Sequence, residues 1–206
     1  MTLEHVYVIP HGDEIIDRPN QESRELYNLI SRIGADDKSE TLVILSPHGL
    51  RLGSSIGVLN TEYLKADLTL KTCRIRRLYR NDRVLAASII ESDNIAQEVA
   101  FITSSGPKSV FPLDFGSIIP LYFFNKKELV AIGQPRIWNS TALVDFGTGL
   151  ARAAQNSERR VSIIVSADQA HTHSPVGPYG FAEESAKYEE MIEKCIRKSD
   201  LSELGQ

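Results

Sequence analysis

Two copies of the tripeptide Pro-His-Gly carry the clearest chemistry in this chain. The first, with His11, follows the apolar run Val6–Ile9, and the second, with His48, follows Leu42–Leu45. Histidine is the commonest metal ligand and the usual acid or base near neutral pH. Ligands of open α/β sheets bind beyond the carboxyl ends of parallel strands. We therefore expect both histidines to emerge from equivalent strand ends and to share a site.

The spacing of the two histidines supports this interpretation. His48 follows His11 by 37 residues, which is enough for one strand-helix-strand unit of roughly 30 residues or more. Such a unit makes its two strands parallel and places them close together. The alternative is that these are two unrelated loop histidines, but the matched sequence context favours a common site.

A third histidine, His171, follows the predicted strand Val161–Val165. Asp168 lies three residues before it and is predicted to orient the imidazole. His173 is interpreted either as a loop-capping residue or as a further ligand. Two histidines and one carboxylate form the group that binds Fe(II) and leaves positions open for substrate and dioxygen. Most other carboxylates near this edge are interpreted as solvated or capping, and Asp114 is the weaker second candidate.

The predicted elements describe one α/β domain over residues 1–206, with a central mixed, mostly parallel sheet flanked by helices. The expected strands are Leu3–Pro10, Thr41–Ser46, Val99–Ile102, Leu129–Ile132 and Val161–Val165, and the expected helices are Asn20–Ile33, Asp82–Ser92, Thr141–Gln155 and Ala182–Lys198. The continuous apolar run in the first strand predicts burial on both of its faces. Gly34 is interpreted as the end of the first helix.

Two further local predictions concern the middle of the chain. The β-prone runs Ser55–Leu59 and Ala66–Leu78 are expected to form a hairpin or meander. Gly147 and Gly149 fall inside a helical pattern, where they would allow close approach to the sheet, so they are not a dinucleotide-binding fingerprint.

Composition narrows the functional classes. The formal charge of −4 argues against a general nucleic-acid or anionic-membrane binder. The basic stretch Lys71–Arg80 is interpreted first as the exposed face of a strand. Two cysteines without a paired motif indicate the reducing cytoplasm, and no signal peptide or membrane span is expected. A Walker loop, a Rossmann fingerprint and a serine nucleophile elbow are absent from the sequence.

Four motifs, in this order, resemble the LigB superfamily, which comprises the catalytic subunits of class III extradiol ring-cleavage dioxygenases and their Memo relatives. The motifs are Pro-His11-Gly-Asp-Glu, Ser-Pro-His48-Gly-Leu-Arg51, Pro-Leu-Asp114-Phe115-Gly, and Ser-Ala-Asp168-Gln-Ala-His171. The resemblance covers almost the whole chain.

The resemblance implies a LigB-like fold in which His11 and His48 bind a non-haem Fe(II), with Zn(II) or Mn(II) as alternative metals. His171 would be the acid/base that takes a proton from a catechol hydroxyl, with Asp168 beside it. The partners would be a small aromatic substrate and O2. Arg51, Asp114 and Phe115 would lie near the substrate, and homo-oligomerisation is left open.

The chain departs from the family pattern in two places. Family enzymes commonly have Asp-His-Gly where this chain has Phe115 after Asp114. Their carboxylate ligand is a glutamate near the end of a longer chain, so this domain is expected to be short at its C-terminus. These departures leave two alternatives: a Memo-like metal-binding or adaptor protein without oxygenase chemistry, and a metal-dependent hydrolase in which His171 or Asp168 activates water and His173 supplies a ligand.

Overall fold

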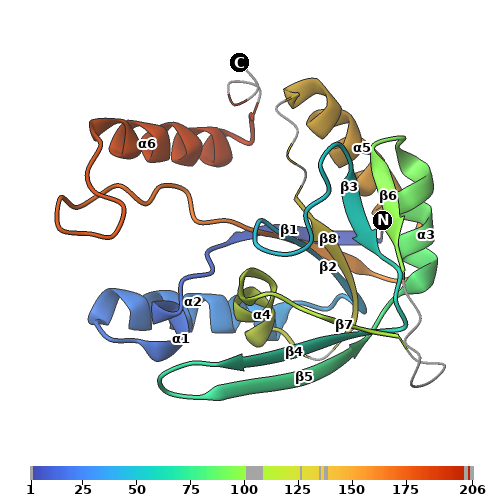
Figure 1. Ribbon diagram of the computed structural model, residues 1–206, viewed down its shortest axis with the longest axis horizontal. Coiled ribbons are helices and arrows are strands. Elements are labelled where there is room, and N and C mark those ends of the chain that lie inside the picture. The colour runs from blue at the N-terminus through green and yellow to red at the C-terminus, as the bar shows by residue number, and fades with distance from the viewer. Residues whose placement is uncertain are drawn as a thin grey trace.

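The computed structural model describes residues 2–100, 109–125, 127–134, 136, 139–201 and 204, and its elements alternate between strands and helices (Figure 1). The strands are β1 (Leu3–Ile9), β2 (Thr41–Ser46), β3 (Ile56–Leu59), β4 (Tyr63–Thr69), β5 (Arg74–Arg80), β6 (Ala96–Val99), β7 (Val110–Pro112), β8 (Glu128–Gly133) and β9 (Val161–Ser166). The helices are α1 (Glu14–Asp17), α2 (Gln21–Asp36), α3 (Arg83–Ser92), α4 (Phe115–Tyr122), α5 (Ser140–Asn156) and α6 (Glu183–Lys198).

The central sheet has the strand order β1-β9-β2-β8-β3-β6. β1, β9, β2 and β8 are mutually parallel, and β3 runs antiparallel to β8. The prediction of a mixed, mostly parallel sheet is confirmed. β1 and β2 are parallel as expected, but β9 lies between them. Because Ile9 pairs with Ser166 and Leu45 with Val165, the ends of all three strands are level.

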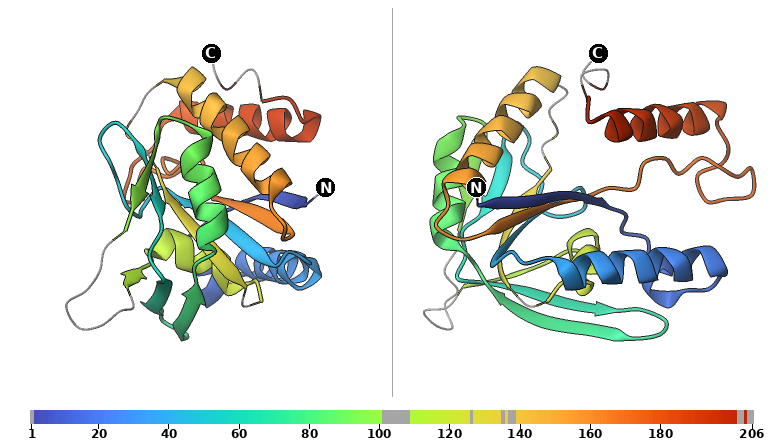
Figure 2. Two further views of the ribbon diagram at one scale, coloured as in Figure 1. Left: turned by 90° about the vertical axis from the view of Figure 1, so that its right-hand side faces the viewer. Right: turned by 180° about the vertical axis from the view of Figure 1, so that it is seen from behind.

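Helices cover the central sheet on both faces (Figure 2). On one face, α3 and α5 pack over a core that includes Val43, Val130 and Phe146. On the other face, α1, α2, α4 and a small second sheet enclose a core that includes Ile44, Leu64 and Phe124. Both cores share the same central sheet, so the chain is a single α/β domain.

The first strand is not buried on both faces as predicted. β1 is the edge strand of the sheet, and Val6 and Val8 are 59% and 46% exposed on its outer face. Ile9 is buried, and Tyr7 packs against the opposite core. A continuous apolar run is typical of a central parallel strand, but here one apolar face lines an open groove beneath α6.

Three glycines behave differently from the prediction, and two of them do so because they pack against residues distant in sequence. Gly34 does not end its helix, since α2 continues to Asp36. A Cβ at Gly34 would lie 2.2 Å from the carbonyl oxygen of Phe123, so this glycine permits α2 to approach the end of α4. Gly149 permits close approach to Ser92 of α3 and not to the sheet, while Gly147 faces open space.

The two middle β-prone runs divide between the sheets. β3 joins the central sheet, whereas β4 and β5 form the antiparallel hairpin of the second sheet, with β7 parallel to β4. The predicted strand Val99–Ile102 was placed too late, since β6 spans Ala96–Val99. Its last two residues, 101 and 102, lie outside the described residues. β6 is an edge strand, so pairing with β3 and not burial determines its position.

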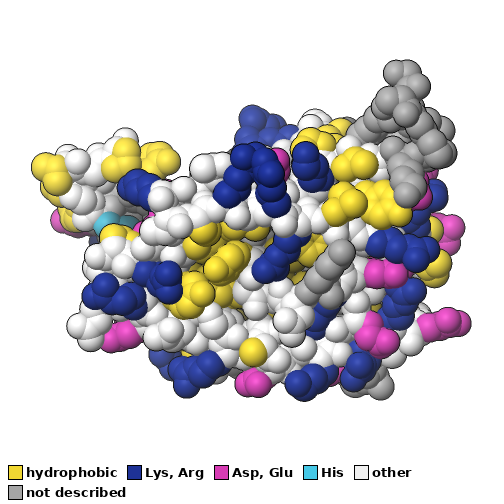
Figure 3. Space-filling view, turned by 90° about the horizontal axis from the view of Figure 1, so that it is seen from below, with side chains coloured by type: hydrophobic (Ala, Val, Ile, Leu, Met, Phe, Trp, Pro, Cys, Tyr) yellow, Lys and Arg dark blue, Asp and Glu magenta, His cyan; other side chains and the backbone are white. Residues whose placement is uncertain are grey.

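The basic stretch forms the exposed side of β5, as predicted, and basic side chains are prominent on the face seen from below (Figure 3). Arg77 is the exception, because it turns inward to the end of α4. Its guanidinium donates hydrogen bonds of 3.0 Å to the carbonyl oxygens of Leu121, Tyr122 and Phe124. These carbonyls lie at and just beyond the C-terminal end of α4, where a helix leaves backbone acceptors without intrahelical partners.

Replacing Arg77 is therefore expected to destabilise the fold. Arg77→Leu removes three charge-assisted bonds and should lower the free energy of unfolding by about 2 kcal/mol or more. The neighbouring Arg76→Leu is the matched control, because Arg76 is exposed and forms an ion pair with Asp67 at the surface, an interaction worth about 0–1 kcal/mol. Urea denaturation of both variants measures the difference, and equal losses would contradict the capping role of Arg77.

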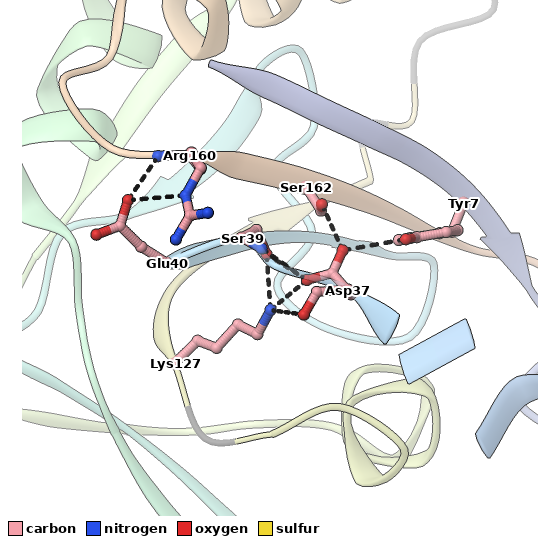
Figure 4. A network of polar contacts seen from close by, with 7 residues as sticks. All are labelled: Tyr7, Asp37, Ser39, Glu40, Lys127, Arg160 and Ser162. Carbon is pink, nitrogen blue, oxygen red and sulfur yellow. Dashed lines mark hydrogen bonds and ion pairs between the residues drawn. The ribbon is translucent and has the colours of Figure 1, made fainter. Parts of the chain in front are cut away.

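A buried ion pair joins the opposite, amino-terminal ends of the strands (Figure 4). Asp37, just after α2, forms an ion pair with Lys127, which precedes β8, and the two side chains are 0% and 7% exposed. The same carboxylate accepts hydrogen bonds from Tyr7 of β1 at 3.0 Å and from Ser162 of β9 at 2.6 Å. Asp37 therefore connects β1, β9 and the segment before β8 to the end of α2.

Two general features complete the fold. Cys73 and Cys195 are both free thiols. In the part of the chain that the structure describes, no helix combines the length and the apolar composition needed to cross a lipid bilayer.

Candidate functional site

The structure brings the two Pro-His-Gly histidines into contact beyond the carboxyl ends of β1 and β2. The Nε2 atoms of His11 and His48 are 2.9 Å apart, and their rings meet edge to face with centroids separated by 4.7 Å. His11 is only 3% exposed. Two imidazole nitrogens that face each other at this distance either share a proton or bind a common cation.

The proton on His11 is placed by its neighbours. Ser166, the last residue of β9, donates its hydroxyl to the carbonyl oxygen of Gly116 at 2.5 Å. A serine hydroxyl has one proton to donate, so Ser166 Oγ must accept the bond from His11 Nδ1, at 3.0 Å. His11 in its neutral form therefore carries its proton on Nδ1 and directs the lone pair of Nε2 toward His48.

The surroundings of His11 favour that neutral form. Burial lowers the pKa of His11, and the nearby His48 and His171 lower it further, whereas the carboxylate of Asp168 acts in the opposite direction. The net pKa is below the ordinary histidine value. A neutral imidazole is the form that coordinates a metal ion.

Asp168 lies at the centre of the site. Its Oδ1 accepts the backbone N–H of His11 at 2.9 Å, and its Oδ2 is 3.4 Å from His11 Nε2. The same Oδ2 is 3.8 Å from Nε2 of His171, whose side chain is about half exposed and contacts the ring of Tyr179. The predicted neighbourhood of Asp168 and His171 is thus present, and Asp168 also reaches the histidine pair.

Asp114 and Phe115 lie on the other side of the histidines because Asp114 is the N-cap of α4. The Asp114 carboxylate accepts the backbone N–H of Ser117 at 3.1 Å and the hydroxyl of Ser46 at 2.6 Å. Phe115 then begins the helix with its ring 4.3 Å from that of His48 and 5.8 Å from that of His11. It is 42% exposed and forms an aromatic wall of the site.

Two predicted residues lie apart from this cluster. Arg51 is exposed and donates hydrogen bonds to the carbonyl oxygen of Pro47, the shorter of them 2.7 Å long, so it braces the loop that carries His48. His173 faces α6, where its Nε2 is 3.1 Å from Glu189.

Sequence reasoning missed Ser166, although it fixes the orientation of His11. The available signal was positional: Ser46 and Ser166 are the last residues of β2 and β9, at the same edge as the histidines. Gly116 was also missed as a site residue. A Cβ there would lie 2.7 Å from Ser46 Oγ and 3.1 Å from His48 Cδ2, so only glycine fits behind the histidine.

Two cavities meet at the loop that carries Asp168. A groove of about 830 Å³ runs between β1 and α6, and Val6, Val8, His171 and Ile192 are among its lining residues. A second cavity of about 410 Å³ lies beneath α5 at the ends of β2 and β9. Ala167, Asp168 and Gln169 line both. The volumes are in the range typical of small-molecule sites.

The donor types fit the metal that the LigB resemblance implies, although among the described residues no three His, Cys, Asp or Glu side chains are arranged as a complete metal-binding group. Two nitrogens bound at right angles to one ion, each about 2.1 Å from it, would lie about 3 Å apart. The observed separation of the His11 and His48 Nε2 atoms is 2.9 Å. Asp168 adds a carboxylate, so the types of donor present, though not their arrangement, match those of a non-haem Fe(II) site.

Comparisons with known proteins identify relatives but no activity. No protein-family model matches the chain. It is 23% identical to Protein CA_C1420 of Clostridium acetobutylicum over 93% of this chain and 44% of that protein, so it spans less than half the length of this relative. It also resembles the crystal structure of uncharacterized protein JW3007 from Escherichia coli K12, with a TM-score of 0.51 and 16% identity over 82% of this chain and 61% of the other. This likeness supports the α/β fold alone.

Proposed function

We propose that this protein is a metal-dependent oxygenase that cleaves the ring of a catecholic aromatic substrate with O2, as the LigB resemblance implies. The observation that carries the proposal is the convergence of His11, His48 and Asp168. The two Nε2 atoms are 2.9 Å apart, and the Asp168 carboxylate is 3.4 Å from His11 Nε2. This is a donor set of the non-haem Fe(II) type, at the sheet edge where α/β proteins bind ligands.

In this proposal, His11, His48 and Asp168 would hold Fe(II), and the metal would supply the redox chemistry of ring cleavage. Zn(II) and Mn(II) are alternative occupants of the same donors. Ser166 holds the tautomer of His11, and the Asp114–Ser46 bond braces the strand end that carries His48. Asp168 thus takes a more direct role than the sequence suggested, in the place of the family's distant glutamate.

The remaining residues of the site would bind the ring and move a proton. His171 is half exposed, lies next to Asp168 and lines the groove under α6, so it can accept a proton from a substrate hydroxyl and return it to product or solvent. Asp168 would stabilise the imidazolium that forms. Phe115 would exclude water from the side of the histidines that faces α4.

The free thiols of Cys73 and Cys195 agree with a cytoplasmic location.

A Memo-like binding or adaptor protein without oxygenase chemistry is the second candidate. The observation that favours it is Phe115, whose ring lies 4.3 Å from His48 at the position where family enzymes commonly have a histidine. An apolar ring there cannot donate or accept a proton. The hydrolase alternative has less support, because His173, its proposed extra ligand, contacts Glu189 of α6.

Iron content and oxygen consumption test the proposal. Protein purified anaerobically and supplied with Fe(II) is expected to bind about one iron per chain. With a panel of catechols it should consume O2 and give yellow ring-opened products. Catechol binding without O2 uptake for any diol would support the adaptor candidate and contradict the oxygenase.

Replacement of His171 separates proton transfer from metal binding. His171→Ala is expected to keep near-normal iron content while turnover falls by about 10²- to 10⁴-fold, the usual contribution of a general acid or base. His173→Ala is the matched control and should turn over normally, since His173 pairs with Glu189. Loss of iron from His171→Ala would instead make His171 a ligand.

A further inference from the structure

The cavity beneath α5 has the form of an aromatic-ring pocket. Its walls are largely apolar, and its polar groups lie mainly where the strands end. The apolar walls are supplied by Leu45, Pro47, Ile56, Leu143, Phe146, Leu150 and Val165. The polar lining residues at the strand ends include Ser46, Ser166 and Asp168. A ligand with one polar edge and an apolar body matches this distribution.

Two residues at the polar end of the cavity also contact His11 of the proposed metal site. Asp168 lines the cavity, and its Oδ2 is 3.4 Å from His11 Nε2. Ser166 also lines it and bonds to the same imidazole. A catechol whose two hydroxyl groups lie at Asp168 would therefore extend its ring away from the metal, between the sheet and Phe146 of α5.

The charges around the cavity limit which ring it accepts. Among the described residues that line it, Asp168 is the one with a formal charge at neutral pH, and it is negative. The adjoining groove contains Arg197, but its guanidinium is 2.7 Å from Glu193 and is already paired. A ring carboxylate in the cavity would be desolvated without a cation to compensate it, which is costly.

We infer that the cavity beneath α5 selects catechols that carry an apolar substituent and no carboxylate, and excludes aromatic acids. This inference rests on the proposed function and names its substrate class. Phe146, Leu143 and Leu150 would contact the apolar part of the ring. The charged groove under α6 would then serve for entry and for the proton path through His171, and not for holding the ring.

Gly147 offers a direct way to fill the cavity. It lines the cavity, and a Cβ built on it has no atom within 4 Å. Gly147→Leu therefore places a side chain in open space and also replaces a glycine inside a helix, which is favourable by roughly 1 kcal/mol. Gly147→Ala adds a single methyl group as a milder variant. Thr148→Leu on the same helix is the matched control, and Val8→Trp fills the groove instead.

Calorimetric titration of Zn(II)-loaded protein tests the inference without turnover. 4-Methylcatechol is expected to bind at least about tenfold more tightly than 3,4-dihydroxybenzoate, because the carboxylate of 3,4-dihydroxybenzoate would be buried in the cavity without a cation. Gly147→Leu should weaken 4-methylcatechol binding by about tenfold or more, with a smaller loss for Gly147→Ala and none for Thr148→Leu or Val8→Trp. Melting temperatures establish that each variant is folded.

Several outcomes would overturn the inference. They are equal affinity for the two ligands, no binding of 4-methylcatechol, wild-type binding by Gly147→Leu, or a loss confined to Val8→Trp. The proposed function is judged separately, by O2 uptake of the iron-loaded protein. Selective catechol binding without O2 uptake would support the inferred ring pocket and contradict the proposed oxygenase activity.

Discussion

Replacing both Pro-His-Gly histidines is expected to abolish metal binding. In His11→Ala/His48→Ala, the two imidazole nitrogens that meet at 2.9 Å are gone, so no donor pair remains to support Asp168. Wild-type protein should gain about 2.7 kcal/mol in free energy of unfolding when the metal is present at 100 times its dissociation constant. The double variant should gain nothing, contain no iron and consume no O2.

Thermal unfolding with and without added Zn(II) or Fe(II), together with elemental analysis, measures this result. Glu189→Gln/His173→Ala is the matched control, because it removes a histidine-carboxylate contact that does not involve His11, His48 or Asp168, at 3.1 Å, and it should respond to metal like wild type. A wild-type protein that binds no metal, or a double variant that is stabilised equally, would reject the metal site.

Asp168→Asn then tests the proposed third donor. The amide oxygen can still accept the backbone N–H of His11, now bonded to Asp168 at 2.9 Å, so the loop should keep its conformation. The negative charge is lost, and metal affinity should fall by about 10- to 100-fold or more. Losses of this size are typical even for residues that only hydrogen-bond to a metal ligand. Unchanged affinity would place Asp168 outside the metal site.

The strand ends were predictable because neighbouring parallel strands share an edge. The tripeptide at His11 and the tripeptide at His48 each close an apolar run, and that pattern was enough to predict their meeting. It did not reveal that β9 lies between β1 and β2, since sequence order does not determine sheet order. The same insertion brings Ser166 beneath His11; its place at a strand end indicates the edge of the sheet but not this contact.

Other differences between the sequence-based predictions and the structure also come from packing between elements that are distant in sequence. Gly34 is of the residue type that commonly ends a helix. It lies inside α2 instead, because the backbone of Phe123 leaves room only for a glycine there. The outer face of β1 is as apolar as a buried strand, but Val6 and Val8 border an open groove. In each case local propensity is overridden by an element more than 80 residues away in sequence, such as Phe123 for Gly34 or α6 for Val6.

Removing the cation of the buried ion pair is expected to cause the largest loss of stability. Lys127→Met leaves the fully buried carboxylate of Asp37 without its charged partner, and breaking a buried pair in this way costs about 3–5 kcal/mol. Lys38→Met is the matched control, because Lys38 is an exposed neighbour of Asp37 and should change the free energy of unfolding by less than about 0.5 kcal/mol. Urea denaturation at pH 7 measures both.

The pH dependence of that loss identifies Asp37 as its cause. Burial acts to raise the pKa of Asp37, but hydrogen bonds from Lys127, Ser162 and Ser39 outweigh it and lower the pKa from 3.8 to about 2. A carboxyl with a depressed pKa stabilises the fold above its unfolded pKa and loses that contribution as pH falls through its folded pKa. Here the contribution is about 2 kcal/mol, present above pH 4 and lost toward pH 2.

In Lys127→Met, burial without the lysine should raise the pKa of Asp37, so the variant takes up a proton at a higher pH than wild type. The difference in free energy of unfolding between the two proteins is therefore expected to be largest near pH 7 and to narrow as the pH falls below about 4. Denaturation at several pH values from 7 to 3 measures it. A difference that stays constant over this range would mean that Lys127 stabilises the fold through its aliphatic contacts and not through the carboxylate of Asp37.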